Sequence, residues 1–121
     1  MKLQISFDLS DLDAAVSIAS EVAQYADILE VGTILIYNHG TEAITRFKEA
    51  CPDSVILADT KIVDRPKEIV ETFAQSGAQW ITVMAGSSKD TIHAATTAAH
   101  NANIKVMLDL IDSSSIGQSA L

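Results

Sequence analysis

A repeat constrains this chain most strongly: short runs rich in β-branched and aromatic residues recur every 25 to 27 positions. The five runs are Leu3–Phe7, Ile28–Val31, Val55–Ala58, Trp80–Met84 and Val106–Ile111. The segments between them place apolar residues at helical spacing, so each repeat predicts one strand followed by one crossover helix. Alternating strands and helices of this length predict an α/β protein built on a parallel sheet.

Local signals mark where the helices begin and end. Ser10, followed three residues later by Asp13, predicts the start of the first helix. Pro66 suits the first turn of the third helix and Gly77 its end. Ser88 predicts the start of the fourth helix.

The number of repeats limits the architecture to two alternatives. The 121 residues hold four complete strand–helix units and a fifth strand, whereas a closed barrel of eight units at this spacing needs about 210 residues. The chain is therefore either a complete open sheet of the flavodoxin or receiver type, or a (β/α)8 TIM barrel truncated after the fifth strand. An open sheet also needs a covering helix after that strand, and residues 112–121, rich in Ser and Gly, predict only a loop that begins one. We therefore expect the truncated barrel, with residues 1–121 forming a single domain.

Composition argues against several classes of partner. A net charge of −8 and a pI near 4.6 argue against a nucleic-acid-binding protein, which needs clustered Lys and Arg. The sequence has no signal-peptide core and no long apolar run, so neither export nor membrane insertion is expected. A single cysteine, Cys51, excludes an internal disulfide and fits a cytoplasmic protein.

Charged residues stand at the ends of the predicted strands. Asp8 ends the first strand, Glu30 lies near the end of the second, Asp59 and Lys61 end the third, and Asp109 lies near the end of the fifth. Ligands of parallel α/β folds bind at the carboxyl ends of the strands, so these side chains predict an active site at that edge. For any single acid, a solvated or loop-capping role is the alternative.

The densest cluster follows the third predicted strand. Side chains alternate along a strand, so Asp59 and Lys61 are expected on the same side, with Thr60 pointing away. Beside a carboxylate, Lys61 stays charged and is able to stabilise an anionic intermediate or to deliver a proton. Asp64, in the following loop, either joins this site or interacts with the dipole of the next helix.

Glu30 and Asp59 come from adjacent predicted strands and offer oxygen ligands at one edge of the sheet. Together they suit an octahedral Mg²⁺ that keeps several water or substrate oxygens. Such an ion polarises a substrate carbonyl and makes the adjacent C–H acidic. The alternative is an acid pair buffered by Lys61 without a metal.

Weaker signals lie in two turns and one histidine. His39, after the second predicted strand, is expected to be an exposed loop residue, with ligand contact as the alternative. The turns Gly32-Thr33 and Gly86-Ser87-Ser88 offer backbone donors, but neither matches a P-loop or a Rossmann fingerprint.

The motifs occur in a characteristic order. They are Leu3-Gln4 through Asp8, Ile28-Leu29-Glu30-Val31-Gly32-Thr33, Asp59-x-Lys61-x-x-Asp64, and Val106-x-x-Asp109-Leu110-Ile111. In this order and at barrel spacing, the whole chain resembles the 3-hexulose-6-phosphate synthase and 3-keto-L-gulonate-6-phosphate decarboxylase group of the orotidine 5′-phosphate decarboxylase superfamily. The Asp-x-Lys-x-x-Asp pattern is short, and it becomes specific in combination with Glu-Val-Gly-Thr one unit earlier.

The resemblance implies a magnesium-dependent site for a phosphorylated sugar. Glu30 and Asp59 match the carboxylates that bind Mg²⁺, and Asp8 and Lys61 match residues that contact substrate and intermediate. Asp64 matches an aspartate contributed by a neighbouring subunit, which implies a homodimer with a shared active site. Both activities of the group pass through a Mg²⁺-stabilised enediolate. The synthase adds this enediolate to formaldehyde, whereas the decarboxylase protonates it after losing CO₂.

Asp109 discriminates between the two activities. The decarboxylase resemblance places Glu at this position, whereas Asp109-Leu110-Ile111 is similar to the synthase, so a lyase of the synthase type ranks first. Thr33-Ile34-Leu35 and Lys61-Ile62 are closer to the decarboxylase, which remains the alternative. Arg65-Pro66 departs from the small residue and Gly that the group usually has at the expected subunit contact.

The resemblance places phosphate-gripping loops and a catalytic His–Arg pair beyond the fifth strand. We therefore expect the 121-residue chain by itself to have little or no activity. Two other hypotheses are a phosphoacceptor receiver, with Asp59 phosphorylated and Asp8 in its acidic pair, and a non-catalytic half-barrel that pairs with another copy. The receiver is disfavoured because Leu9 follows Asp8 and because the fifth strand ends in Asp109, where a receiver has Lys.

Overall fold

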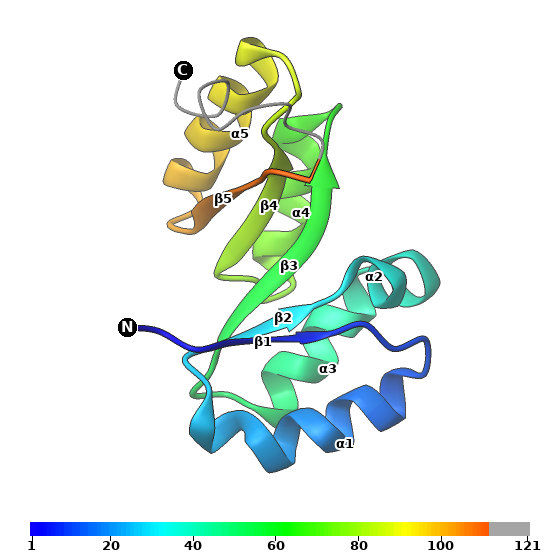
Figure 1. Ribbon diagram of the computed structural model, residues 1–121. Helices are drawn as coiled ribbons and strands as arrows, with labels where there is room; N and C mark the ends of the chain where they lie inside the picture. The colour runs from blue at the N-terminus through cyan, green and yellow to red at the C-terminus, as the bar shows by residue number, and fades with distance from the viewer. Residues whose placement is uncertain (112–121) are drawn as a thin grey trace.

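The computed structural model describes residues 1–111, in which strands and helices alternate (Figure 1). The strands are β1 (Gln4–Phe7), β2 (Ile28–Val31), β3 (Val55–Ile62), β4 (Trp80–Met84) and β5 (Lys105–Asp109). The helices are α1 (Leu12–Val22), the short 3-10 helix η1 (Ala23–Tyr25), α2 (Thr33–His39), α3 (Thr41–Ala50), α4 (Pro66–Gln75) and α5 (Lys89–Asn101). All five predicted strands are present, and the loop predicted over residues 112–121 lies outside the described residues.

The strands form one parallel sheet in the order β1-β2-β3-β4-β5. A flavodoxin-like or receiver sheet instead has its first strand between the second and third, so the receiver hypothesis is wrong. Neighbours in the sheet are neighbours in the sequence, as in a closed barrel. Figure 1 shows the sheet turning strongly between β1 and β5.

The two faces of the sheet have different chemistry. Alternate side chains, such as Phe7 and Val31, are buried in one core with residues from all five α-helices. Within this core the rings of Phe7 and Phe47 meet edge to face, with centroids 5.1 Å apart. Each such buried apolar side chain stabilises the fold by about 1.5–3 kcal/mol. The side chains between them, including Glu30 and Thr82, therefore point to the opposite face, which we call the inner face.

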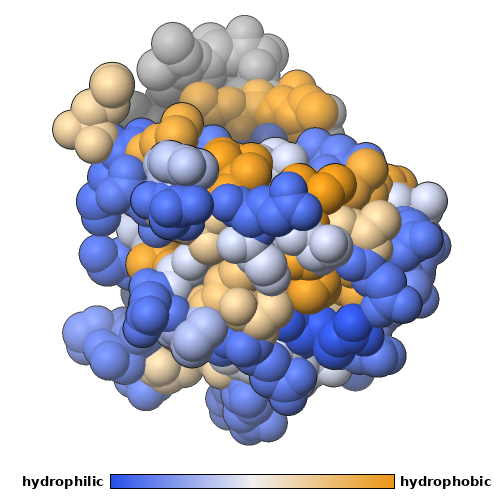
Figure 2. Space-filling view, turned by 90° about the horizontal axis from the view of Figure 1, so that it is seen from below, coloured by the Kyte–Doolittle hydropathy of each residue, from blue (hydrophilic) through white to orange (hydrophobic). Residues whose placement is uncertain are grey.

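The outside of the molecule is mixed in character. Figure 2 shows hydrophilic side chains interrupting the hydrophobic areas over the face seen from below. Among residues 1–111, no helix combines the length and the apolar character that crossing a membrane requires.

The helix boundaries mostly follow the local signals. Asp11, not Ser10, caps α1, and its carboxylate accepts a 3.0 Å hydrogen bond from the third helical N–H. The Ser10 prediction is wrong because Asp11 is itself a strong capping residue and stands directly before the first helical residue. Pro66 begins α4, Ser88 caps α5, and Gly77, at a φ of 106°, follows the end of α4.

Strand β3 contains a bulge and continues past its predicted end at Ala58. The pairing advances from Ala58 to Ile62 on β3, while it advances only from Ile81 to Val83 on β4. Within the bulge Lys61 has a φ of 48°, a left-handed conformation that costs a non-glycine residue about 1–2 kcal/mol. Bulges of this kind re-aim side chains beside functional sites.

Candidate functional site

Three charged side chains meet at the carboxyl ends of β3 and β5. Lys61 Nζ lies 3.0 Å from Asp59 Oδ2 and 2.6 Å from Asp109 Oδ2. Asp59 is buried, with 5% of its surface exposed, whereas the side chain of Lys61 keeps 33% of its surface exposed. Asp59 and Lys61 are in contact on one side of β3, as predicted. The backbone between them is not a regular strand, however, because Lys61 lies in the bulge. We call Asp59, Lys61 and Asp109 the acid–lysine cluster.

Two threonine hydroxyls hold the carboxylate of Asp59. Thr33 Oγ1 donates to Asp59 Oδ2 at 2.7 Å, and Thr82 Oγ1 donates to Asp59 Oδ1 at 2.9 Å. From the sequence, Thr33 was expected only to belong to a turn with backbone donors, and Thr82 was not predicted. The available signal for Thr82 was its position in β4, two residues from Trp80 and Met84, on the face that carries the charged residues.

The ion pairs shift the pKa of Lys61 and the pKa of Asp109. Burial alone would lower the pKa of Lys61, but the hydrogen bonds to Asp109 and Asp59 outweigh it and raise this pKa above its ordinary value. Burial alone would raise the pKa of Asp109, but the hydrogen bonds from Lys61 and from the N–H of Ile111, at 2.9 Å, lower it. Lys61 therefore stays charged at neutral pH, as expected beside a carboxylate.

Glu30 of β2 and Asp8 both accept hydrogen bonds from side chains of β1. Glu30 is in register with Ser6 of β1, and its carboxylate accepts a hydrogen bond from the side-chain amide of Gln4. Asp8 directly follows β1, and its Oδ2 accepts a 3.0 Å hydrogen bond from Ser6 Oγ. Over residues 1–111 the ion pairs of Lys61 join it to Asp59 and Asp109, not to these two acids.

The acids at the sheet edge can be compared with the needs of a metal ion. Glu30 is in register with Leu57, and Asp59 follows Leu57 by two positions, so the two carboxylates lie on the inner face of adjacent strands. Within residues 1–111, no group of three or more His, Cys, Asp or Glu is placed so that it could hold a metal ion by itself. Two hard oxygen donors suit Mg²⁺, which keeps several waters or substrate oxygens, better than a structural zinc ion with four protein ligands.

The hydrogen bonds of Asp64 and His39 are made with residues outside the acid–lysine cluster. Asp64 is exposed after β3, and its Oδ1 accepts a 2.8 Å hydrogen bond from the N–H of Arg65. His39 ends α2 and is partly buried, with Nε2 3.0 Å from the carbonyl oxygen of Ser10. The prediction of an exposed loop histidine is wrong because α2 begins only two residues after β2 and extends through His39.

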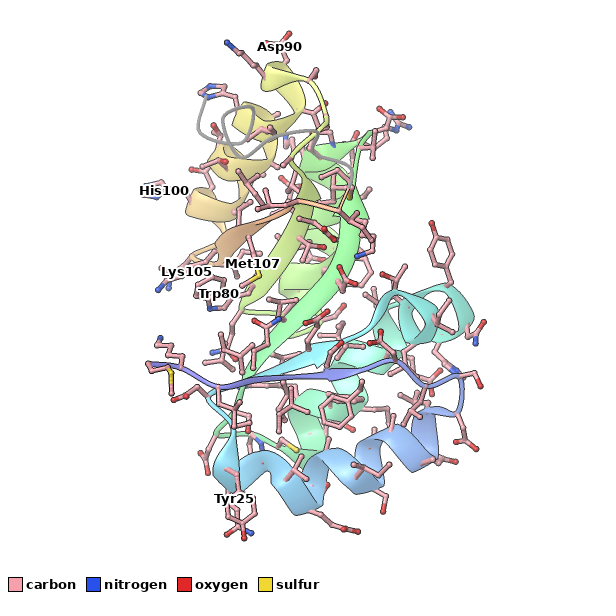
Figure 3. The ribbon with its side chains drawn as sticks, viewed as in Figure 1. Tyr25, Trp80, Asp90, His100, Lys105 and Met107 are labelled. Atoms are coloured by element: carbon pink, nitrogen blue, oxygen red, sulfur yellow. The ribbon has the colours of Figure 1, made fainter. Side chains whose placement is uncertain are left out.

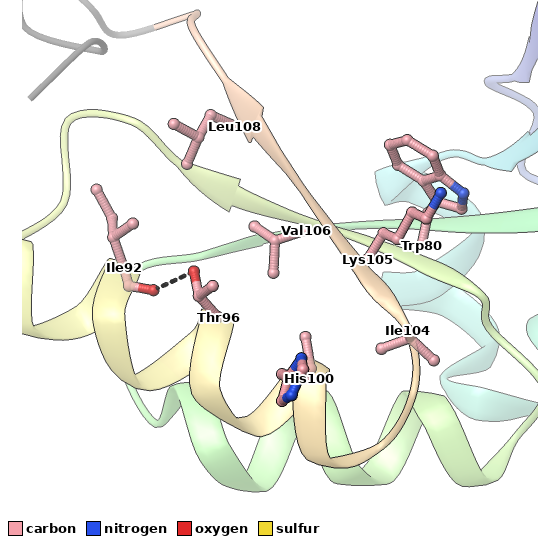
Figure 4. A pocket seen from close by; sticks show the side chains of 9 residues that line it. Trp80, Ile92, Thr96, His100, Ile104, Lys105, Val106 and Leu108 are labelled. Atoms are coloured by element: carbon pink, nitrogen blue, oxygen red, sulfur yellow. Dashed lines mark hydrogen bonds between the residues drawn. The ribbon is translucent and has the colours of Figure 1, made fainter.

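A separate groove runs beside α5 and β5 (Figure 4). Its lining is Trp80, Ile92, Thr96, Ala99, His100, Ile104, Lys105, Val106 and Leu108. Trp80 and Lys105 are the first residues of β4 and β5, and Figure 3 shows them grouped with Met107. The ammonium of Lys105 lies 5.2 Å from the centre of the Trp80 ring. The lining contains no carboxylate, so the groove is distinct from the candidate site.

The fold and the site define a class of protein: a parallel α/β protein with the strand order of a barrel and with acids and a lysine at the carboxyl ends of its strands. Residues 1–119 match the Orotidine 5′-phosphate decarboxylase / HUMPS family. The chain belongs to this family, which confirms the resemblance seen in its motifs.

Individual relatives agree with this assignment. The 3-hexulose-6-phosphate synthase of Mycobacterium gastri is 40% identical over 111 residues, which are 92% of this chain and 54% of the relative. A crystal structure of 3-hexulose-6-phosphate synthase is similar with a TM-score of 0.95 at 38% identity, covering 99% of this chain and 58% of that one. The crystal structure of a 3-keto-L-gulonate-6-phosphate decarboxylase from Vibrio cholerae is similar with a TM-score of 0.91 at 31% identity. The match covers 97% of this chain and 55% of that one.

The chain therefore spans about half the length of the relatives that it matches. Its consecutive parallel strands and its likeness to these structures confirm the predicted fold class, four units and a fifth strand of a (β/α)8 barrel.

Proposed function

We propose that this chain belongs to a lyase of the 3-hexulose-6-phosphate synthase type, which adds formaldehyde to ribulose 5-phosphate through an enediolate. The acid–lysine cluster at the carboxyl ends of barrel strands carries the proposal, because Lys61 brings a positive charge to an acidic edge. Relatives with this name at up to 40% identity support it. The activity is proposed for a complete barrel that contains this chain, since the relatives are about twice as long.

Lys61 has the central role in the proposed chemistry. Its ammonium, held between Asp59 and Asp109, faces the inner side of the sheet with a third of its side chain accessible. A fixed positive charge stabilises negative charge that develops on a sugar oxygen in the transition state. Asp59 and Asp109 orient the ammonium and keep it protonated. Asp8, beyond the end of β1, is proposed to contact the sugar hydroxyls.

Glu30 and Asp59 are proposed to hold Mg²⁺. They are on the inner face of neighbouring strands, and both are hard oxygen donors. When bound, Mg²⁺ polarises the substrate carbonyl and makes the adjacent C–H acidic. Thr33 and Thr82 hold the Asp59 carboxylate in place through one hydrogen bond to each of its oxygens.

Asp64 is proposed to act in a second copy of the chain. Its exposed position after β3, with its hydrogen bond made to the neighbouring Arg65, supports this role. The assembly that follows from it is a homodimer with a shared active site.

The second candidate function is 3-keto-L-gulonate-6-phosphate decarboxylase. The likeness to the Vibrio cholerae enzyme favours it, and so does the Thr33-Ile34-Leu35 segment noted above. Asp109 favours the synthase, because a shorter acid stands where the decarboxylase resemblance places Glu. We therefore place the synthase first.

A fusion protein separates the two activities. Residues 1–111 would be joined to the second half of the Mycobacterium gastri synthase, which is 40% identical over the shared half. The fusion would be assayed with ribulose 5-phosphate plus formaldehyde, and separately with 3-keto-L-gulonate 6-phosphate. Aldol product from the first assay supports the synthase, CO₂ release in the second alone supports the decarboxylase, and a folded fusion inactive in both contradicts the proposal.

The metal site can be tested on the chain itself. Mn²⁺ is a paramagnetic ion that prefers the same oxygen ligands as Mg²⁺. We expect Mn²⁺ to broaden the NMR signals of Glu30 and Asp59 first, and excess Mg²⁺ to restore them. Glu30→Gln is expected to abolish the effect, whereas Glu71→Gln on α4 is the matched control that retains it. Equal broadening in Glu30→Gln and the unaltered chain would contradict the metal assignment.

A further inference from the structure

Thr82 lies on β4, between the strands that carry the two acids of the acid–lysine cluster. It is 5% exposed. Its hydroxyl oxygen is 2.9 Å from Asp59 Oδ1 and 2.9 Å from the backbone nitrogen of Lys61. One buried hydroxyl thus contacts two of the three members of the cluster.

The direction of these two hydrogen bonds follows from the donors available. A threonine hydroxyl has one proton to donate and two lone pairs that accept. The backbone N–H of Lys61 can only donate, so the Thr82 oxygen accepts from it. The single hydroxyl proton is then directed to the carboxylate of Asp59, which accepts. The hydroxyl therefore has one orientation that satisfies both neighbours.

Thr82 is also the residue opposite the bulge of β3. The register of β3 against β4 shifts between Ala58 and Ile62, and Thr82 lies between their partners Ile81 and Val83. The carbonyl of Thr82 accepts a 2.9 Å hydrogen bond from Thr60 Oγ1, and its hydroxyl accepts from the N–H of Lys61. Two groups of Thr82 therefore join β4 to the bulge of β3, where Lys61 has a φ of 48°.

We propose that Thr82 is a positioning residue, whose hydroxyl holds the Lys61 backbone in the left-handed conformation that aims the ammonium at Asp59 and Asp109. The proposal rests on the proposed function only in taking the acid–lysine cluster as the place of the chemistry. It requires the hydroxyl, not merely a β-branched side chain of this volume.

Thr96 shows a different arrangement, which supplies a control. Thr96 Oγ1 donates at 2.8 Å to the carbonyl of Ile92, within its own helix (Figure 4). Such a bond is local and touches no residue of the acid–lysine cluster. Replacing the hydroxyl of Thr96 by a methyl group therefore removes a threonine hydrogen bond without touching β3.

The test compares Thr82→Val, Thr82→Ser and Thr96→Val in the full chain. Amide hydrogen exchange at Lys61 is measured relative to the amide of Leu29 in β2, which corrects for changes in overall stability. The NMR signal of the Lys61 ammonium is recorded on the same samples. We expect Thr82→Val to speed Lys61 exchange roughly tenfold relative to Leu29 and to broaden the ammonium signal. Thr82→Ser is expected to restore both readouts, and Thr96→Val to leave both unchanged.

Unchanged Lys61 exchange in Thr82→Val, or a failure of Thr82→Ser to restore it, would overturn the proposal. If Thr82→Val does not fold, Thr82→Ser is compared with Thr82→Ala, which differ by the hydroxyl alone. Equal Lys61 exchange in that pair would also overturn it. Neither measurement uses metal or substrate, so its outcome is independent of the assays of the proposed function.

Discussion

Lys61 of β3 and Asp109 of β5 form a 2.6 Å ion pair across the intervening strand β4. Their strands are not neighbours, so no ladder contact places these side chains together. Lys61 belongs to the bulge of β3. The pair therefore links β3 to β5, over the strand between them, at the edge where the candidate site lies.

Removing one charge of this pair is expected to destabilise the fold. Asp109→Asn leaves Lys61 with one carboxylate partner in a partly buried position. We expect the free energy of unfolding to fall by about 1–2 kcal/mol, a value reduced by the solvent exposure of Lys61. Urea denaturation measures the change. The control is Glu71→Gln, which breaks an exposed 4.0 Å pair with Lys67 on α4 and is expected to change the value by about 0.5 kcal/mol or less. Equal effects of the two substitutions would contradict the prediction.

The same pair predicts how stability depends on pH. The pKa of Asp109 in the folded protein lies below its ordinary value of 3.8, so its contribution is present above that pH and is lost as the pH falls through the lowered value. The pKa of Lys61 lies above its ordinary value of 10.5, so its contribution is present below 10.5 and is lost as the pH rises through the raised value.

The measurement is the difference in unfolding free energy between the unaltered chain and Lys61→Met. We expect this difference to be constant between about pH 5 and pH 9 and to shrink toward both extremes. A difference that stays constant down to pH 2 would show that the ionisation of Asp109 does not contribute.

Gly32 permits a close approach of the ends of β1 and β2. A Cβ at this position would lie 2.5 Å from Asp8 Oδ1 and 2.6 Å from the carbonyl oxygen of Phe7. Gly32→Ala is expected to lower the free energy of unfolding by about 1–3 kcal/mol and to shift the NMR signals of Asp8. Gly40→Ala is the control, because a Cβ there meets nothing within 4 Å although its φ of 59° is strained. It is expected to destabilise the chain without moving Asp8, and unshifted Asp8 signals in Gly32→Ala would refute the steric account.

The chain by itself is expected to turn over ribulose 5-phosphate and formaldehyde slowly or not at all. It spans 54% of the Mycobacterium gastri synthase, and the proposed reaction needs a grip on the substrate phosphate beyond the acid–lysine cluster. Product formation by the purified chain is measured beside the fusion protein described above. Turnover by the chain equal to that of the fusion would contradict this expectation.

Within the fusion, Lys61→Met is expected to lower kcat/KM by roughly 10²–10⁴-fold, because it removes the positive charge of the cluster. The matched control is Lys67→Met, whose ammonium is exposed on α4. It is expected to leave kcat/KM unchanged. Similar losses in both variants would show that general surface charge, not the cluster, supports the reaction.

Much of the fold could be predicted because the strands repeat. β2 and β4 occupy the predicted residues, and the other three strands lie within a few residues of their predicted bounds. Charged residues at the ends of successive strands converge on one edge whenever the strands are parallel, so the position of the site followed from the fold class. Asp59 and Lys61 were found in this way.

The remaining features depend on contacts between strands, which a single sequence does not specify. Periodicity gives the face of each side chain but not the register of β3 against β4, so the bulge and the Lys61–Asp109 pair were not predicted. The sequence indicates only that Thr82 belongs to a strand, because its contacts with Asp59 and Lys61 depend on the register of β3. Ser10 and Asp11 are adjacent residues of equal capping ability. Which of them caps α1 depends on the residue at which the helix begins, and local sequence rules do not fix that residue.

The consecutive strand order has a consequence for how the chain folds. Each pairing closes a segment of similar length, from 21 residues between Ile62 and Val83 to 27 residues between Ile28 and Val55. Loop-closure entropy grows only with the logarithm of length, so every new strand meets nearly the same entropic barrier. Each unit docks on the edge left by the unit before it, as in solenoid proteins. The sheet can therefore grow during translation in the direction in which the chain leaves the ribosome.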